Sequence, residues 1–239
     1  MREAGRINAE VLATVKALLK PGVSTADLNA AAEEVLKKHK CFSPFKGYGH
    51  PPFPTSITTS INRELVHGIP NRNRKLKDGD IISIDCGTVL DGLVADSAFT
   101  AGVGHISSEA GNLLEVTEGA LKAGIEQMRS GNHTGDISAA IQNHVESRGY
   151  FVTREYTGHG VGRQMHEGPQ VPNYGKPGTG SVLKAGMTIA IEPMVLVGTE
   201  ETRVLPDQWT VVSADGSLTA HFEHSVAVTE GDPLILTIL

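Results

Sequence analysis

The sequence predicts an α+β fold in which two similar halves share a central antiparallel sheet and the helices pack on one side of it. Two observations lead to this prediction. Helical patterns come in pairs, two before residue 41 and two between residues 107 and 148, and strand-like runs follow each pair. The second half also repeats motifs of the first in the same order, at nearly the same offset.

The internal repeat has two parts. Thr25–Phe42 aligns without a gap with Thr134–Phe151 and shares with it a Thr, an Asp, two Ala and the closing Phe. Further along, Leu76–Asp85 (LKDGDIISID) aligns with Leu183–Glu192 (LKAGMTIAIE). Each copy ends a strand on a carboxylate, so we expect the two terminal acids to meet near a pseudo-twofold axis.

Four segments have the pattern of helices. The first is amphipathic and ends at Pro21-Gly22, and the second opens on a capping box that pairs Ser24 with Asp27. The glycine- and proline-rich stretch Gly158–Gly180 is predicted to be loop. The predicted helices span Arg2–Lys20, Thr25–Lys40, Ser107–Arg129 and Thr134–Arg148.

The central strands form the clearest part of the predicted sheet. Asp80–Leu90 and Leu93–Thr100 flank Asp91-Gly92, a strong two-residue hairpin turn. This register sets Asp85 opposite Ala98, so that Asp85 and Asp96 share one face as diagonal neighbours. The other predicted strands are Ile57–Ile61, Met187–Val197, Trp209–Val212 and Thr219–Val228.

The two aspartates of the hairpin point to a metal site. Burying ionised carboxylates costs several kcal/mol unless cations neutralise them. Three further residues join Asp85 and Asp96: His159 between glycines, Glu192 at a strand end and Glu223 within an apolar run. Four carboxylates and one imidazole suit manganese, iron, cobalt or zinc, and two divalent ions balance the charge better than one. Paired ions roughly 3.5–4 Å apart can hold a bridging hydroxide and polarise a carbonyl, so hydrolysis is the predicted reaction.

Composition excludes several other classes of protein. The net charge is −6 and there is no Lys/Arg run, so nucleic-acid readout is not expected. No apolar run is long enough to span a membrane, and the charged N-terminus is not a signal peptide. Cys41 and Cys86 form no spacing pattern, which favours a reducing compartment and hence the cytoplasm. A serine nucleophile has no support because there is no GxSxG motif.

The motifs, taken together, are similar to those of a known enzyme family. The strings NRELVHGIP, IDCGTVLDGLVADSA, GHGVGRQMHEGPQV, IEPM and FEHSVAVTE resemble type I methionine aminopeptidases, members of the pita-bread metallopeptidases. The resemblance implies the pita-bread fold and a single catalytic domain over 1–239, with halves at about 1–105 and 106–239. It implies removal of the initiator methionine from nascent proteins and peptides, by attack of a metal-bridging hydroxide on the first peptide bond. The implied cofactors are two divalent ions, cobalt, manganese, iron or zinc.

The resemblance also assigns roles to the five metal-binding candidates. Asp85 would chelate one ion, and His159 would help to complete the other. Asp96 and Glu223 would bridge both ions. Glu192 would bind metal and also carry the proton of the attacking water.

Two histidines and four pocket residues complete the implied site. His166 matches the family histidine that stabilises the tetrahedral intermediate, and His67 matches the one that contacts the scissile amide. Thr58 stands where many members carry Cys, and Met165 where Phe is common. The residues expected to bind substrate are His67, His166, Phe53, Thr58, Met165 and Trp209.

Three alternatives fit the sequence less well. An X-Pro peptidase of the same fold generally has an additional N-terminal domain, whereas this chain is expected to begin with the catalytic unit. A type II methionine aminopeptidase would carry a long insertion between His159 and Glu192. A metal-free interaction module would have lost its ligands. The implied partner is the free N-terminus of a peptide or nascent chain, with transient ribosome association and a monomeric state resting on the resemblance alone.

Overall fold

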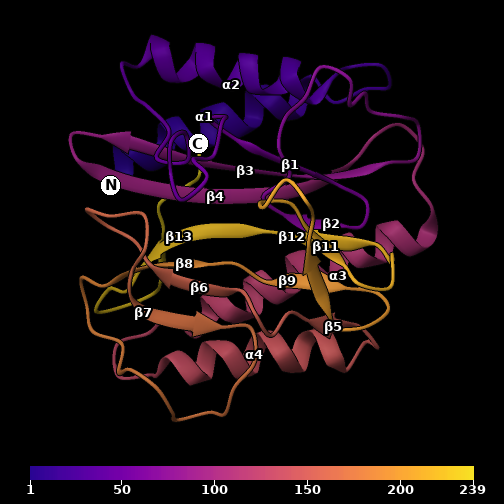
Figure 1. Ribbon diagram of the computed structural model, residues 1–239. Helices are drawn as coiled ribbons and strands as arrows, with labels where there is room; N and C mark the ends of the chain where they lie inside the picture. The colour runs from indigo at the N-terminus through magenta and orange to yellow at the C-terminus, as the bar shows by residue number, and fades with distance from the viewer.

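The computed structural model describes residues 1–239 and has the predicted α+β architecture (Figure 1). The four predicted helices are present, each within a few residues of its expected ends. Ser24 closes the predicted capping box with Asp27 at the start of the second helix. The helices are α1 (Arg2–Ala17), α2 (Thr25–Lys38), α3 (Ser108–Glu126) and α4 (Thr134–Glu146).

The strands form one large sheet and two small ones. The large sheet has the order β1-β3-β4-β13-β8-β6-β7, with β14 paired to β13, and every pairing in it is antiparallel. Two three-stranded sheets, β10-β11-β2 and β12-β9-β5, lie beside it. The strands are β1 (Thr58–Ile61), β2 (Glu64–Val66), β3 (Ile81–Leu90), β4 (Leu93–Gly102), β5 (Phe151–Val152), β6 (Thr157–Gly160), β7 (Glu167–Pro172), β8 (Thr188–Ile191), β9 (Met194–Leu196), β10 (Thr202–Val204), β11 (Val211–Ser213), β12 (Thr219–His221), β13 (Glu223–Ala227) and β14 (Leu234–Ile235).

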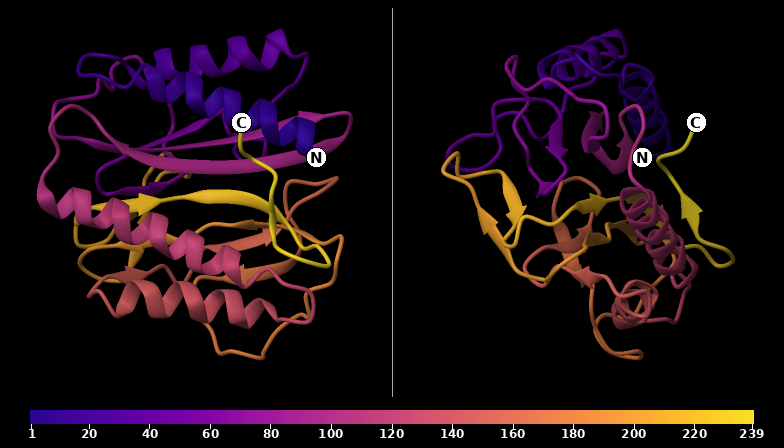
Figure 2. Two further views of the ribbon diagram at one scale, coloured as in Figure 1. Left: turned by 180° about the vertical axis from the view of Figure 1, so that it is seen from behind. Right: turned by 90° about the vertical axis from the view of Figure 1, so that its right-hand side faces the viewer.

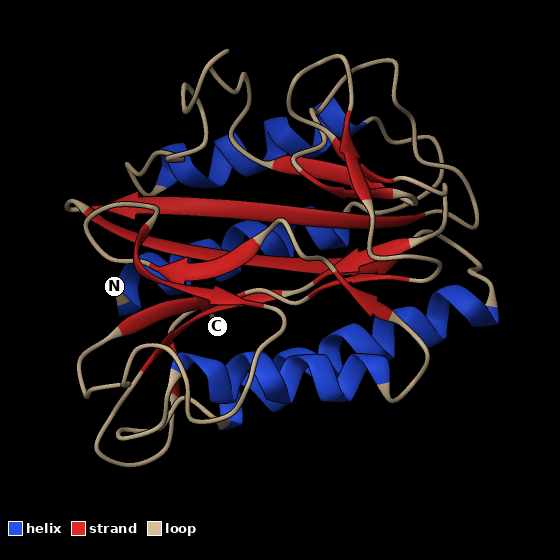
Figure 3. Cartoon of the chain, turned by 60° about the horizontal axis from the view of Figure 1, so that its bottom comes forward, coloured by secondary structure: helices blue, strands red, loops and turns tan.

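The two halves of the chain meet where β4 pairs with β13. In Figure 1 the helices α1 and α2 lie above the first-half strands, α4 lies below the second-half strands, and α3 passes behind them. The views from behind and from the side (Figure 2), and the view with the bottom brought forward (Figure 3), show both helix pairs against the outer face of the curled sheet. The pita-bread architecture with its pseudo-twofold sheet is therefore confirmed.

Each half has its own hydrophobic core between its helices and its strands. Leu28 of α2 packs with Ile82 and Ile84 of β3 in the first core. Ile137 of α4 packs with Ile189 of β8 in the second. Cys86 is fully buried in the first core, on the side of β3 opposite to its neighbour Asp85, as predicted. Two cores flanking one sheet leave the junction of the halves free for polar side chains.

The predicted loop Gly158–Gly180 is wrong in its first part, which forms the hairpin β6-β7. Glycine is required there because the strands run very close together. A Cβ on Gly158 would lie 2.6 Å from the carbonyl oxygen of Ala190, and one on Gly160 would lie 2.2 Å from that of Gly168. The prolines of β7 are tolerated because β7 is an edge strand.

Two predicted long strands are each divided. Met187–Val197 breaks into β8 and β9 at Glu192 and Pro193, where the chain passes from the large sheet into a small one. Thr219–Val228 breaks in the same way into β12 and β13. Both breaks coincide with predicted site acids. The short strands β2, β5, β10 and β14 were not predicted, since two or three residues carry too little periodicity.

Candidate active site

The central hairpin presents its two aspartates as the sequence predicted. Asp85 is paired with Ala98, and Asp96 is paired with Gly87. Both side chains are buried, with only 8% and 4% of their surface exposed. Ser225 holds the main chain of Asp96, accepting from its N–H at 2.9 Å and donating to its carbonyl oxygen at 2.8 Å.

The strand register brings the acids of the second half beside those of the first. Ala98 of β4 is paired with Asp85 on one side and with Glu223 of β13 on the other. Residues directly opposite one another share a face of the sheet, so Asp85 and Glu223 project to the same side. Glu192 follows the last residue of β8, which is the strand next to β13. The four predicted carboxylates therefore come from three neighbouring strands and the end of a fourth.

The imidazole of His159 is held in one tautomer. Its Nδ1 lies 2.9 Å from the carbonyl oxygen of Gly160, which can only accept, so Nδ1 carries the proton. The lone pair is then on Nε2, which lies 3.4 Å from Oε1 of Glu192. A histidine that donates through one nitrogen and offers the other is oriented as metal-binding histidines are.

The site has the electrostatic properties of a cation site. Ligand atoms of Asp96, His159 and Glu223 all lie within 4.8 Å of one another. One carboxylate oxygen on each of Asp85, Asp96 and Glu223 is buried without a hydrogen-bond partner. Burial raises the pKa of Asp96 to about 7, and burial with repulsion from the neighbouring acids raises the pKa of Asp85 and Glu223 well above the ordinary range. Burial also raises the pKa of Glu192. Divalent cations would remove this cost, so the residues fit the implied metals.

A cavity of about 170 Å³ joins these residues to the other predicted site residues. His67 has a left-handed backbone (φ 60°), a conformation that costs free energy in a non-glycine residue and is typical of functional positions. Burial lowers the pKa of His67 to about 4, so the ring is neutral near pH 7. His166, in the β6-β7 connection, has its ring centroid 4.4 Å from that of His159.

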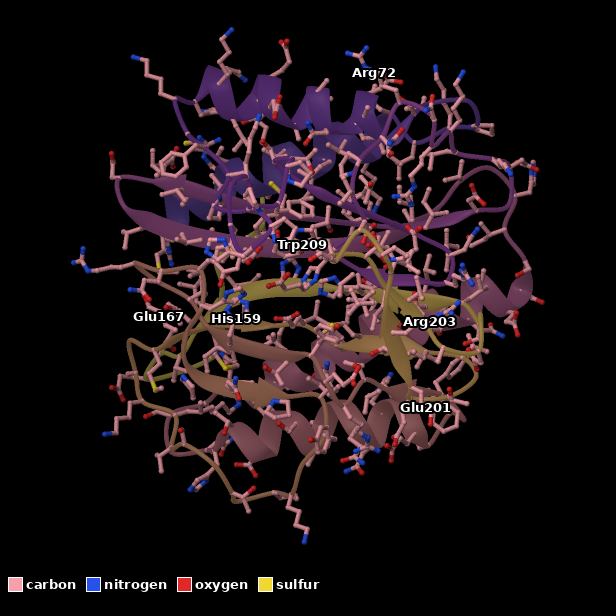
Figure 4. The ribbon with its side chains drawn as sticks, viewed as in Figure 1. Arg72, His159, Glu167, Glu201, Arg203 and Trp209 are labelled. Carbon is pink, nitrogen blue, oxygen red and sulfur yellow. The ribbon has the colours of Figure 1, made fainter.

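The predicted pocket residues Phe53, Thr58, Met165 and Trp209 all line the same cavity. Phe53 and Trp209 meet edge to face, with centroids 5.2 Å apart. Met165 belongs with Phe53 to a small apolar cluster beside the acids. Figure 4 places Trp209 above His159 on the open face of the molecule. The cavity therefore has one apolar side and one acidic side. The prediction did not include six other lining residues: Phe45, Tyr48, Val66, Tyr156, Thr157 and Met194.

A histidine of the site, His221, was also missed. It is buried, and its Nε2 lies 3.8 Å from a carboxylate oxygen of Glu192 and 3.8 Å from one of Glu223, with no hydrogen-bond partner. Burial lowers its pKa to about 3, so the ring is neutral. The signal was present in the sequence, because His221 precedes Glu223 by two residues and period-two alternation places both on one face.

Comparison with known proteins decides the family. The model of metallopeptidase family M24 matches residues 1–230. The chain belongs to metallopeptidase family M24. Among M24 relatives, methionine aminopeptidase of Clostridium acetobutylicum is 51% identical over 238 residues, covering 100% of this chain and 94% of that protein. Methionine aminopeptidase 1 of Bacillus subtilis is 51% identical over 237 residues, covering 99% and 94%.

A solved M24 structure agrees with the fold. Methionine aminopeptidase of Thermotoga maritima superposes with a TM-score of 0.98 at 44% identity, covering 100% of this chain and 95% of that one. The resemblance to type I methionine aminopeptidases is confirmed, and so is the prediction of a hydrolytic enzyme of this family. No helix of this M24 peptidase combines the length and apolar character that a membrane crossing requires. The roles assigned to individual residues stay predictions.

The acidic cluster predicts an unusual pH dependence for the metal-free protein. A raised carboxyl pKa means that the folded chain holds protons that the unfolded chain releases, so the free energy of unfolding falls as pH rises. Buried histidines act in the opposite direction, but only below about pH 6.5, where unfolded histidine binds a proton. Above about pH 6.5 only the carboxyl groups make the free energy of unfolding depend on pH in this way.

The melting temperature with chelator present should therefore fall from about pH 6.5 to about pH 8.5, and added manganese should reverse the fall. A melting temperature that rises over this range without metal would contradict the assignment.

Proposed function

We propose that this M24 peptidase removes the N-terminal methionine from peptides and nascent chains, with two divalent ions in its site. The observation that carries the proposal is the meeting, in one cavity, of four carboxylates, three of them buried, and one oriented imidazole with an apolar wall. Relatives about half identical over nearly the whole chain, named methionine aminopeptidase, support the substrate.

Five residues would hold the ions: Asp85, Asp96, His159, Glu192 and Glu223. Asp96 and Glu223 are proposed to be shared, since each has a buried oxygen without a hydrogen-bond partner and both residues offer a ligand atom within 4.8 Å of one on His159. Cobalt, manganese, iron and zinc all suit this donor set. When bound, two such ions supply a strongly acidified water as nucleophile and polarise the substrate carbonyl.

The chain's own residues bind and orient the substrate. Phe53, Met165 and Trp209 would surround the methionine side chain, and Thr58 would lie at the same pocket. The acidic side of the cavity favours the positively charged α-amino group, which fits removal of a single terminal residue. An N-acetylated peptide has no such charge and should not be cleaved.

Three residues would act on the scissile peptide bond. His166 would donate a hydrogen bond to the carbonyl oxygen as negative charge develops on it. His67, neutral near pH 7, would contact the amide nitrogen. Glu192 is half-buried, whereas Asp85, Asp96 and Glu223 are buried. Glu192 would carry the proton from the attacking water to the departing amine.

The proposal extends to the setting of the reaction. We propose that residues 1–239 act as one catalytic domain, as a monomer in the cytoplasm, on chains presented at or after release from the ribosome. The relatives' printed names support the peptide substrate alone, and the remaining points rest on the resemblance.

Release of free methionine tests the proposed function. Metal-stripped protein would be assayed with manganese or cobalt added back, on Met-Ala-Ser, its N-acetylated form and a matched Ala-Pro peptide. Metal-dependent release from free Met-Ala-Ser only is the expected result. Cleavage before proline would assign the protein to the X-Pro peptidases, and inactivity with every metal would favour a non-catalytic module.

A further inference from the structure

The side chains of Tyr48 and His166 contact each other at the cavity. The hydroxyl oxygen of Tyr48 lies 2.8 Å from Nδ1 of His166, and the two rings meet edge to face with centroids 5.4 Å apart. Tyr48 lies in the loop between α2 and β1, and His166 lies 118 positions further along the chain, in the β6-β7 connection. The two residues therefore join opposite halves of the molecule at the mouth of the cavity.

The main chain around Tyr48 is held at several points. Its N–H donates to the carbonyl oxygen of Phe45 at 2.9 Å, and its carbonyl oxygen accepts from the N–H of Phe53 at 2.8 Å. The flanking glycines, Gly47 and Gly49, both have left-handed backbones, with φ of 89° and 75°. This tight loop fixes where the hydroxyl lies, although 45% of the Tyr48 surface is exposed.

Trp209 supports the loop from the other side. Its indole N–H donates to the carbonyl oxygen of Pro51 at 3.0 Å. A Cβ on Gly49 would lie 2.6 Å from the indole ring, so the ring packs directly on the glycine backbone. The same loop that supplies Phe53 to the apolar wall therefore delivers the Tyr48 hydroxyl to His166.

The contact matters because a neutral imidazole has one N–H, and only one tautomer of His166 can serve the proposed reaction. A phenol can donate to Nδ1, which leaves the proton of the ring on Nε2. His159, the neighbouring ring, has the reverse arrangement, because Gly160 accepts from its Nδ1 and leaves Nε2 as a lone pair. Two adjacent histidines are thus held in opposite tautomers, one offering a lone pair and the other a proton.

We propose that Tyr48 is a positioning residue whose hydroxyl donates to Nδ1 of His166 and holds His166 as the Nε2–H tautomer that donates to the substrate carbonyl oxygen. The inference rests on the proposed function, because the substrate carbonyl enters only there. The link between Tyr48 and the tautomer of His166 does not depend on the substrate and can be measured separately.

Tyr48→Phe tests the proposal, because it removes the hydroxyl and keeps the ring. We expect kcat for Met-Ala-Ser to fall about 5–20-fold, as for loss of one hydrogen bond to a catalytic group, with KM within about twofold and metal content unchanged. Tyr174→Phe is the matched control, since the Tyr174 ring packs on Arg154 away from the cavity. The control should behave as the unaltered enzyme.

Two further readouts separate positioning from a packing effect. Imidazole ¹⁵N shifts of the zinc-loaded enzyme should show His166 as Nε2–H, and Tyr48→Phe should shift it toward a mixture of tautomers. In a double-mutant cycle, Tyr48→Phe should have no further effect on kcat in the His166→Ala background.

Three results would overturn the proposal: a raised KM with unchanged kcat, an unchanged tautomer of His166, or fully additive effects of Tyr48→Phe and His166→Ala. If the unaltered enzyme releases no methionine, the proposed function fails, and the ¹⁵N shifts still decide the Tyr48–His166 link.

Discussion

Replacing Asp96 with Asn is expected to abolish peptide hydrolysis while making the metal-free protein more stable. The side chain is buried, and one of its oxygens has no hydrogen-bond partner. Keeping this carboxylate ionised in the folded protein therefore costs free energy, as its raised pKa indicates. Asn keeps the shape and removes the charge, so the repulsion from Asp85 and Glu223 falls and the melting temperature without metal should rise.

The loss of activity should exceed the roughly 10²–10³-fold that removal of one oxyanion donor costs, because the residue proposed to be shared by both ions would hold the site together. Glu223→Gln should behave in the same way. Asp91→Asn is the matched control: Asp91 is exposed at the hairpin turn with φ of 50°, a conformation that Asn tolerates. Activity, bound metal and melting temperature would be measured for all three variants. An Asp96→Asn enzyme with most of its turnover would contradict the shared role.

His166→Ala has the second largest expected effect, a fall in kcat of about 10²-fold or more with metal content intact. The expectation follows from position, because His166 lines the cavity beside His159 and contacts no carboxylate of the cluster. Its loss should remove a hydrogen bond that is strongest as charge develops on the carbonyl oxygen, so kcat should fall more than KM rises.

His105→Ala is the control for His166→Ala, since its side chain is fully exposed and lies outside the cavity. Metal bound per chain would be measured beside the kinetics. Loss of an ion from His166→Ala would mean that His166 is a ligand, and unchanged kcat would mean that it does not contact the reacting carbonyl.

The central hairpin shows how much of this molecule local pattern can predict. Asp91-Gly92 sets the register of β3 and β4, and period-two alternation then places Asp85 and Asp96 on one face. The repeat between Leu76–Asp85 and Leu183–Glu192 predicted that both halves bring an acid to the axis. These features depend on neighbours in sequence, and the structure reproduces them.

Other features depend on contacts between distant segments and left weak signals. The hairpin β6-β7 was missed because the glycines that let its strands approach closely also have the composition of a loop. The breaks at Pro193 and Phe222 arise where the chain changes sheets, which no run of apolar residues records. The contact of Tyr48 with His166 depends on two loops from opposite halves. His221 alone could have been found, from its spacing to Glu223.

The most direct test of the account is to locate and count the metal ions by anomalous diffraction from crystals soaked with manganese. We expect two peaks, both beside Asp96 and Glu223, with Asp85 next to one and His159 and Glu192 next to the other. A single peak, or two peaks that share no carboxylate, would contradict a two-metal hydrolytic site.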